Sequence, residues 1–134
     1  MSDKTRIIES ISLPNGLQAE FVDFSRRVAG DRWLVGFDVR IPIKVEEKDF
    51  LQFDNSSEVM EKFLSSHGDT VFFEIKRERN FIDEKEKDDI LEDMLKKVKQ
   101  HMLEYMGHAD FAKGVKREKL KEFEERLHWY PDDN

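Results

Sequence analysis

The most constraining feature of this sequence is a regular alternation of apolar and other residues from Trp33 to Val45. Within these thirteen positions every second residue is apolar: Trp33, Val35, Phe37, Val39, Ile41, Ile43 and Val45. A period of two is typical of a β-strand that buries one face and exposes the other. The stretch therefore predicts a long strand in a half-exposed antiparallel sheet. Pro42 cannot donate a backbone hydrogen bond, so we expect the sheet edge near that residue.

Three further strands are predicted on either side of this one. Arg6–Leu13 and Leu17–Arg27 flank Pro14-Asn15-Gly16, a sequence typical of a hairpin turn. The apolar positions of the second segment change phase, which predicts a β-bulge at Phe21–Val22 and leaves Asp23 on the exposed face. Thr70–Arg77 alternates again and predicts the fourth strand.

Helical periodicity appears in the second half of the chain. A short helix is expected after Asn55, a long helix down to Met106 that ends at a left-handed Gly107, and a last helix over residues 110–127. The order β-β-β-α-β-α-α predicts an α+β fold, in which an antiparallel sheet of about four strands packs against a long C-terminal helix. The length of 134 residues predicts a single domain over residues 1–134.

Composition narrows the class of protein. The sequence has no cysteine and no apolar run of about 20 residues, the length that a membrane span requires, so we expect a cytoplasmic protein without a membrane anchor. Residues 46–134 carry 16 Lys and Arg against 24 Asp and Glu. This acidic half would repel phosphate backbones, so nucleic acid is not an expected partner. No cofactor motif occurs, and we expect no cofactor.

One triplet suggests catalysis. Glu74-Ile75-Lys76 resembles the acidic-x-lysine motif of restriction-endonuclease-like nucleases, in which these groups and an aspartate on a neighbouring strand bind a divalent metal ion. Strand alternation places Asp38, Glu74 and Lys76 on exposed strand faces, where they could converge. A solvated strand face shows the same acidic and basic alternation, so the nuclease is the alternative hypothesis and not the first.

A second group has metal-ligating side chains. His101, Glu104 and His108 stand at helical offsets of three and seven. The offset of seven spans about 10 Å along a helix, which is long for two ligands of one ion. We therefore expect exposed or capping histidines and no metal site, and a metal site at these residues is the alternative hypothesis.

The outer face of the predicted sheet suggests binding. Arg40, Lys44 and Lys76 lie there together with Phe72, and such residues recognise carboxylates, phosphates or acidic protein segments. These four residues are the predicted ligand-binding set, for an unknown protein or a small anionic ligand. The competing interpretation is a solvated face without a ligand. An open sheet edge near Pro42 would also permit self-association. We therefore expect the protein to be a monomer or a homodimer.

The N-terminal third carries one resemblance. Leu13-Pro14-Asn15-Gly16-Leu17, followed by Ser25-Arg26-Arg27-Val28-Ala29-Gly30-Asp31-Arg32-Trp33, is similar to segments of small uncharacterised bacterial proteins. The resemblance implies a bacterial protein but no activity and no site residue. Because catalytic motifs are lacking, the sequence favours a small binding or regulatory module without catalytic activity. The alternatives are the metal-dependent nuclease and a self-associating structural protein.

Overall fold

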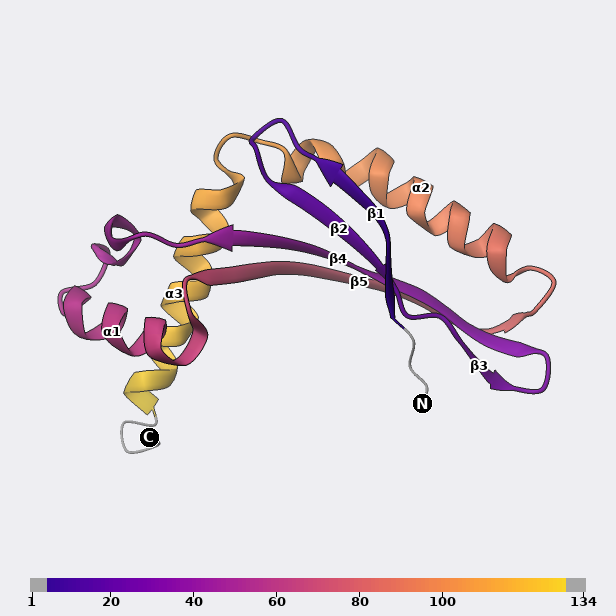
Figure 1. Cartoon of the computed structure of the whole chain (residues 1–134), viewed down its shortest axis with the longest axis horizontal. Helices are drawn as coiled ribbons and strands as arrows, with labels where there is room; N and C mark the ends of the chain where they lie inside the picture. Colours follow the sequence, from indigo (N-terminus) through magenta and orange to yellow (C-terminus); the bar gives the residue numbers. More distant parts are fainter. Residues whose placement is uncertain (1–4, 130–134) are drawn as a thin grey trace. The chain divides into compact units, whose positions relative to one another are not determined.

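The computed structural model describes residues 5–129 and confirms the α+β class (Figure 1). An antiparallel sheet of five strands combines with three α-helices and one short 3-10 helix, η1. The elements are β1 (Arg6–Ser12), β2 (Gln18–Asp23), β3 (Arg26–Ala29), β4 (Arg32–Lys44), η1 (Glu47–Phe50), α1 (Ser56–His67), β5 (Thr70–Asp83), α2 (Lys87–Met106) and α3 (Phe111–Trp129). No helix within these residues is long and apolar enough to cross a membrane.

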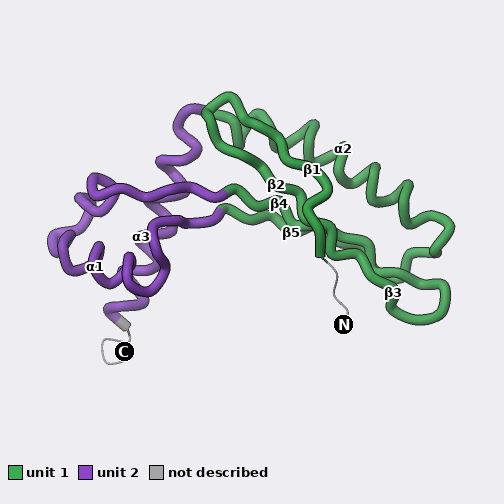
Figure 2. Tube along the Cα trace, viewed as in Figure 1, with its two compact units in different colours: residues 1–41, 73–108 green, residues 42–72, 109–134 purple. Residues whose placement is uncertain are grey.

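The chain forms two compact units, each built from two separate segments (Figure 2). Unit 1 comprises residues 1–41 and 73–108, and unit 2 comprises residues 42–72 and 109–134. Strands β4 and β5 contribute residues to both units. The single domain predicted over residues 1–134 stays a prediction.

The sheet of unit 1 is organised around β4, as the alternating pattern predicted. β2 and β3 lie end to end along one side of β4, because one register runs from the pair Asp23–Phe37 to the pair Arg27–Trp33. β5 runs along the other side of β4, and within residues 5–129 β1 pairs only with β2. The inward row of β4 is almost inaccessible to solvent and forms the core: Val35, Phe37, Val39 and Ile41.

The number of strands and the position of the bulge differ from the prediction. Residues 17–27 do not form one strand, because the Asp23 carboxylate accepts the Ser25 backbone N–H at 2.8 Å and the Ser25 hydroxyl accepts the Gly36 N–H at 3.0 Å. These side-chain bonds separate β2 from β3, which gives five strands instead of about four. The predicted bulge at Phe21–Val22 is wrong. The irregularity lies in β1 between Ile7 and Glu9, so β2 keeps its alternation and Asp23 points inward with only 8% of its surface exposed.

Pro42 lies where the pairing of β4 becomes one-sided, as predicted. The Val45 N–H donates to Asp69 at 2.8 Å on the β5 side, so alternation turns the Pro42 nitrogen away from β5. The pairing of β4 with β2 has already ended at Arg40. The missing donor of proline therefore interrupts no ladder.

Helix α2 packs its buried residues Met94, Val98 and Met106 into the core of unit 1. Its C-terminus differs from the prediction, because Gly107 has a φ of −90° and is not left-handed. A Cβ at this position would lie 2.7 Å from the Pro14 ring, so the close approach of the first hairpin requires a glycine. The Asn15 amide completes the junction by donating to the Met106 carbonyl at 2.9 Å.

Unit 2 has an aromatic core between its helices. Phe63 of α1 meets Phe123 of α3 edge to face at 5.1 Å, and Phe50 of η1 lies 5.8 Å from Phe63. A salt bridge of 3.1 Å joins Lys116 of α3 to Asp49 of η1, and both side chains are largely buried. Helix α3 continues through Gly114 as one helix over residues 111–129.

Candidate binding groove

Strand β1 forms an edge of the sheet in unit 1, and its outer side has no neighbouring strand among residues 5–129. The Leu13 N–H donates to Leu17 at 2.8 Å, and the register pairs Ile11 with Ala19. In an antiparallel ladder, alternate residues direct their backbone groups toward the partner strand. The N–H and C=O groups of Ser10 and Ser12 therefore point outward from β2, where an added strand would bind them.

Among residues 5–129, three strands have a side without a neighbouring strand: β1, β3 and β5. β3 has only four residues, and two of them are arginines. β5, the opposite edge, carries a continuous run of four charged residues from Lys76 to Arg79. Charges on an edge strand discourage pairing with another chain. β1 carries only Arg6 and Glu9 as charged residues, together with small serines and an isoleucine, Ile7, that is 61% exposed. The composition therefore leaves β1 as the edge open to pairing.

Two neighbouring pockets lie along one side of α2 and are together called the groove. One part has a volume of about 600 Å³ and is lined by Glu9 of β1 and by residues of α2: Glu92, Leu95, Lys96, Lys99 and Gln100. A second part of about 330 Å³ lies toward the start of α2 and includes Arg6, Asp23, Trp33, Lys87, Asp88 and Leu91. The helical positions recur every three to four residues, so they form one stripe along α2.

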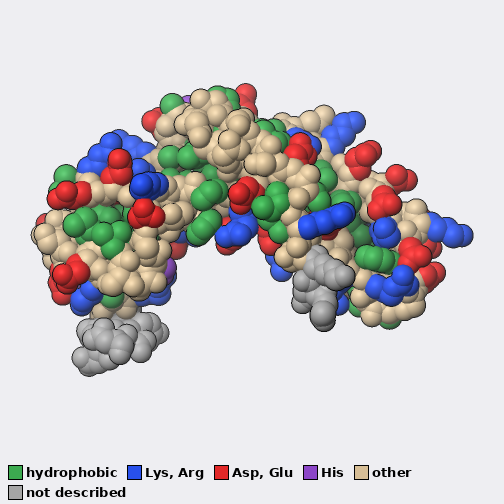
Figure 3. Space-filling model, viewed as in Figure 1, with side chains coloured by type: hydrophobic (Ala, Val, Ile, Leu, Met, Phe, Trp, Pro, Cys, Tyr) green, Lys and Arg blue, Asp and Glu red, His purple; other side chains and the backbone are tan. Residues whose placement is uncertain are grey.

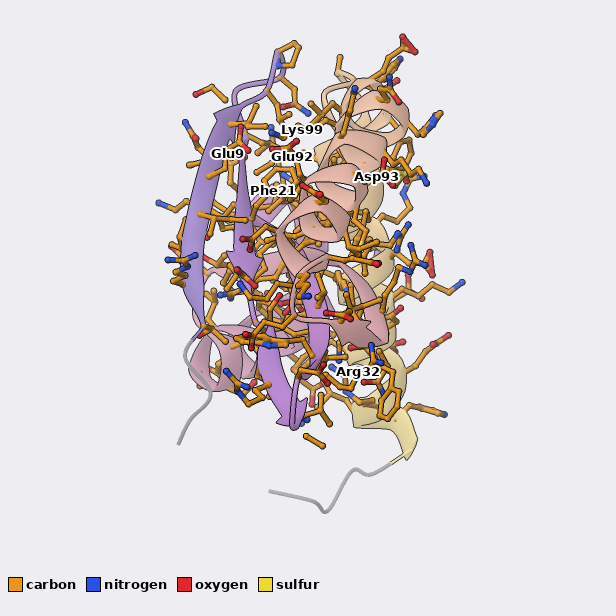
Figure 4. All side chains as sticks on the ribbon, turned by 90° about the vertical axis from the view of Figure 1, so that its right-hand side faces the viewer. Glu9, Phe21, Arg32, Glu92, Asp93 and Lys99 are labelled. Carbon is orange, nitrogen blue, oxygen red and sulfur yellow. The ribbon has the colours of Figure 1, made fainter. Side chains whose placement is uncertain are left out.

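The larger pocket of the groove is bridged by one ion pair. Lys99 of α2 donates to the Glu9 carboxylate at 2.5 Å, and each side chain remains about one third exposed, at 33% and 38%. Figure 4 shows Glu9, Glu92 and Lys99 directed into the space between strand and helix, whereas Asp93 lies on the other side of the helix. The Lys99 ammonium also lies 5.8 Å from the centre of the Phe21 ring. Polar and apolar surface are therefore both available to a bound segment.

The end of the groove near the start of α2 is built around Trp33. The indole N–H donates to Glu84 at 3.0 Å, and Glu84 accepts a second contact from Arg27 at 2.9 Å. The Arg27 guanidinium and the Lys87 ammonium lie 5.5 and 4.8 Å from the ring centre. Such contacts fix the orientation of the indole at the wall of the pocket.

The predicted ligand-binding residues each contact other groups of the protein. In unit 1, Arg40 forms a 3.1 Å salt bridge with Glu74, and Lys76 lies 3.7 Å from Glu78 and over the Phe24 ring. In unit 2, Lys44 pairs with Asp69 at 3.7 Å, and Phe72 is 38% exposed. Figure 3 shows the same interspersion of cations and anions on the face it displays. Binding of an anion at these residues stays a prediction.

The contacts of the candidate catalytic and metal-ligating residues do not test either hypothesis. Glu74 contacts Arg40 and Lys76 contacts Glu78, as described above, and Asp38 lies opposite Val22 of β2. His101, Glu104 and His108 are all exposed. Across residues 5–129, no group of three or more His, Asp or Glu side chains is arranged to hold a metal ion. Both hypotheses stay untested predictions.

No protein family, curated protein or solved structure matches this chain. The functional argument therefore depends on the geometry of unit 1. Sequence reasoning placed Trp33 only in the core row of β4 and Asp23 on the exposed face, so it missed both groove residues. In the structure Trp33 is surrounded by Arg27, Glu84 and Lys87. These residues come from distant segments of the sequence, and only the pairing of those segments brings them together.

Proposed function

We propose that this protein is a small binding module that docks an extended segment of a partner protein along β1. The observation that carries the proposal is an unpaired strand edge beside a groove that follows one stripe of α2. Addition of a strand to a sheet edge is a general mode of peptide recognition, in which main-chain hydrogen bonds give affinity and alternate side chains fill pockets. We also propose a cytoplasmic location, supported by the absence of cysteine from the sequence.

The docked segment would bond the outward backbone groups of Ser10 and Ser12. Its alternate side chains would point toward α2, since successive residues of a strand face opposite sides. The groove beside Glu9 then receives one such side chain against Leu95 and the stem of Lys96. Long lysine side chains cover apolar surface with their methylene groups, so an apolar residue is compatible with this part of the groove.

Proline substitutions at the outward positions test the proposal. Peptides of twelve random residues are selected for binding to the intact protein, and the selected peptides are measured by calorimetry on Ser10→Pro and Ser12→Pro. Proline removes an outward N–H without removing a bond of the β1–β2 ladder, so the fold is retained. We expect about tenfold or greater loss of affinity, the effect of about 1.4 kcal/mol.

Ser10→Ala and Ser12→Ala are the matched controls, because they shorten the same side chains but keep the N–H. Circular dichroism checks that all four variants are folded. Equal affinity of the proline and alanine variants would overturn the proposal, as would failure of the selection. A second copy of this chain paired through β1 would instead appear as a concentration-dependent dimer that Ser12→Pro dissociates, and this outcome also contradicts the proposal.

A further inference from the structure

The pocket at Trp33 has a polar end that the docking of a main chain does not explain. We propose that it takes a guanidinium or ammonium group, the cationic side chain of the docked segment. The inference rests on the proposed function for the identity of the segment, whereas the cation site is argued from the pocket itself.

The first observation is the burial of Asp23. Only 8% of the surface of Asp23 is exposed, and the residue lies in the pocket of about 330 Å³. One carboxylate oxygen accepts the Ser25 N–H at 2.8 Å. The other oxygen has Arg6 as its charged partner, but at 3.9 Å. A close ion pair has a separation of about 2.8 Å, so Arg6 leaves room for a stronger partner.

The second observation is the position of the cations at this pocket. The Arg6 side chain is 76% exposed, whereas that of Asp23 is 11% exposed. The Lys87 ammonium is neutralised by Asp88, at 3.1 Å. The least exposed charge of the pocket is therefore the negative charge of Asp23, since the Lys87 side chain is 28% exposed, and an entering cation would replace Arg6 at Asp23 without burying a net charge.

The third observation is the indole of Trp33. Two cations of the protein lie within 5.5 Å of its ring centre, so the ring is a wall of the pocket that already contacts positive groups. Leu91 and the buried Val35 complete the lining with apolar surface. A carboxylate beside an aromatic ring and aliphatic side chains suits the charged head and methylene stem of an arginine or lysine.

A titration with butylguanidinium tests the inference on the intact protein. The Trp33 indole N–H is followed by NMR at constant ionic strength, and neutral butylurea of similar shape is the control ligand. We expect a saturable shift with butylguanidinium and none with butylurea. Asp23→Asn should weaken binding by about tenfold, because the charge-assisted bond is lost. Asp93→Asn, an exposed carboxylate on the other side of α2, should change the affinity by less than about threefold.

Arg6→Gln separates a cation site from an anion site. If Arg6 occupies the place of the ligand, its removal strengthens the binding of butylguanidinium by about threefold or more, because a competing cation is lost. Weaker binding in Arg6→Gln, or a saturable shift produced by acetate and abolished by this substitution, would overturn the inference.

The two proposals fail in different ways. Peptides that lose affinity in Ser12→Pro but need no basic residue, together with no effect of butylguanidinium, would contradict the cation site and leave strand docking intact. Saturable binding of butylguanidinium without any selected peptide would support the cation site and contradict strand docking.

Discussion

The salt bridge between Lys116 and Asp49 provides the sharpest prediction about stability. It is 3.1 Å long, and its side chains are only 14% and 13% exposed, which makes it far less exposed than an ordinary surface pair. The same carboxylate accepts the Glu46 N–H at 2.6 Å and so completes the capping box of η1. The pair therefore joins α3 to η1 within unit 2 and also stabilises the start of η1.

Asp49→Asn should destabilise unit 2 strongly. The substitution keeps the size of the side chain but leaves the Lys116 ammonium buried without a counter-charge. Removing one partner of a buried pair costs about 3–5 kcal/mol, and residual exposure favours the lower end, about 3 kcal/mol. The double variant Asp49→Asn with Lys116→Met should recover to within about 1 kcal/mol of the native protein, because no charge remains buried.

Urea unfolding followed by circular dichroism measures the free energies, and hydrogen exchange of α3 amides reports on unit 2 separately. The matched control is Asp93→Asn, which breaks the exposed pair of Asp93 and Lys97, with side chains 52% and 65% exposed. This change should cost less than about 1 kcal/mol. A cost below about 1 kcal/mol for Asp49→Asn, or additive costs in the double variant, would refute the reasoning.

Three further predictions concern two glycines and one carboxyl group. Gly114→Ala should stabilise the protein by about 1 kcal/mol in thermal unfolding, because it lies inside α3 and, apart from its chain neighbours and the helix backbone around it, no atom of the described residues lies within 4 Å of a new Cβ. Gly36→Ala should destabilise it, since the Cβ would lie 2.5 Å from the Phe24 ring and 2.9 Å from the Arg77 carbonyl; equal effects at the two sites would contradict this. A hydrogen bond from Asn55 lowers the pKa of Glu58, with Lys62 as a further cause. The contribution of the ionised Glu58 is therefore present above pH 4.5 and is lost as the pH falls through the lowered pKa. Asn55→Ala should raise this pKa in an NMR titration, and an unchanged midpoint would exclude the bond as its main cause.

The fold was predictable where the pattern repeats over many residues. The inward row of β4 and the helix down to Met106 follow from period and length, and both are confirmed. The break between β2 and β3 was not predictable, because it depends on side-chain bonds of Asp23 and Ser25 to the backbone. Periodicity in residues 17–27 alone cannot distinguish such a break from a bulge.

The candidate groove was less predictable than the fold. Strand order makes β1 an edge, and strand order depends on which distant segments pair. The same limit applies to Gly107, whose contact with Pro14 connects residues that are far apart in the sequence. The exposed charged face that the sequence did indicate is present, but Arg40 and Lys76 already have acidic partners within it.

Hydrogen exchange of the edge amides tests strand docking most directly. A selected peptide is added to the native protein, and the exchange rates of the Ser10 and Ser12 amides are compared with those of Glu74 and Lys76 on the opposite edge strand. If the peptide adds a strand to β1, the exchange of the two serine amides slows by about tenfold or more, while the amides of β5 keep their rates. Unchanged serine amides in a complex that is saturated with peptide would contradict docking along β1.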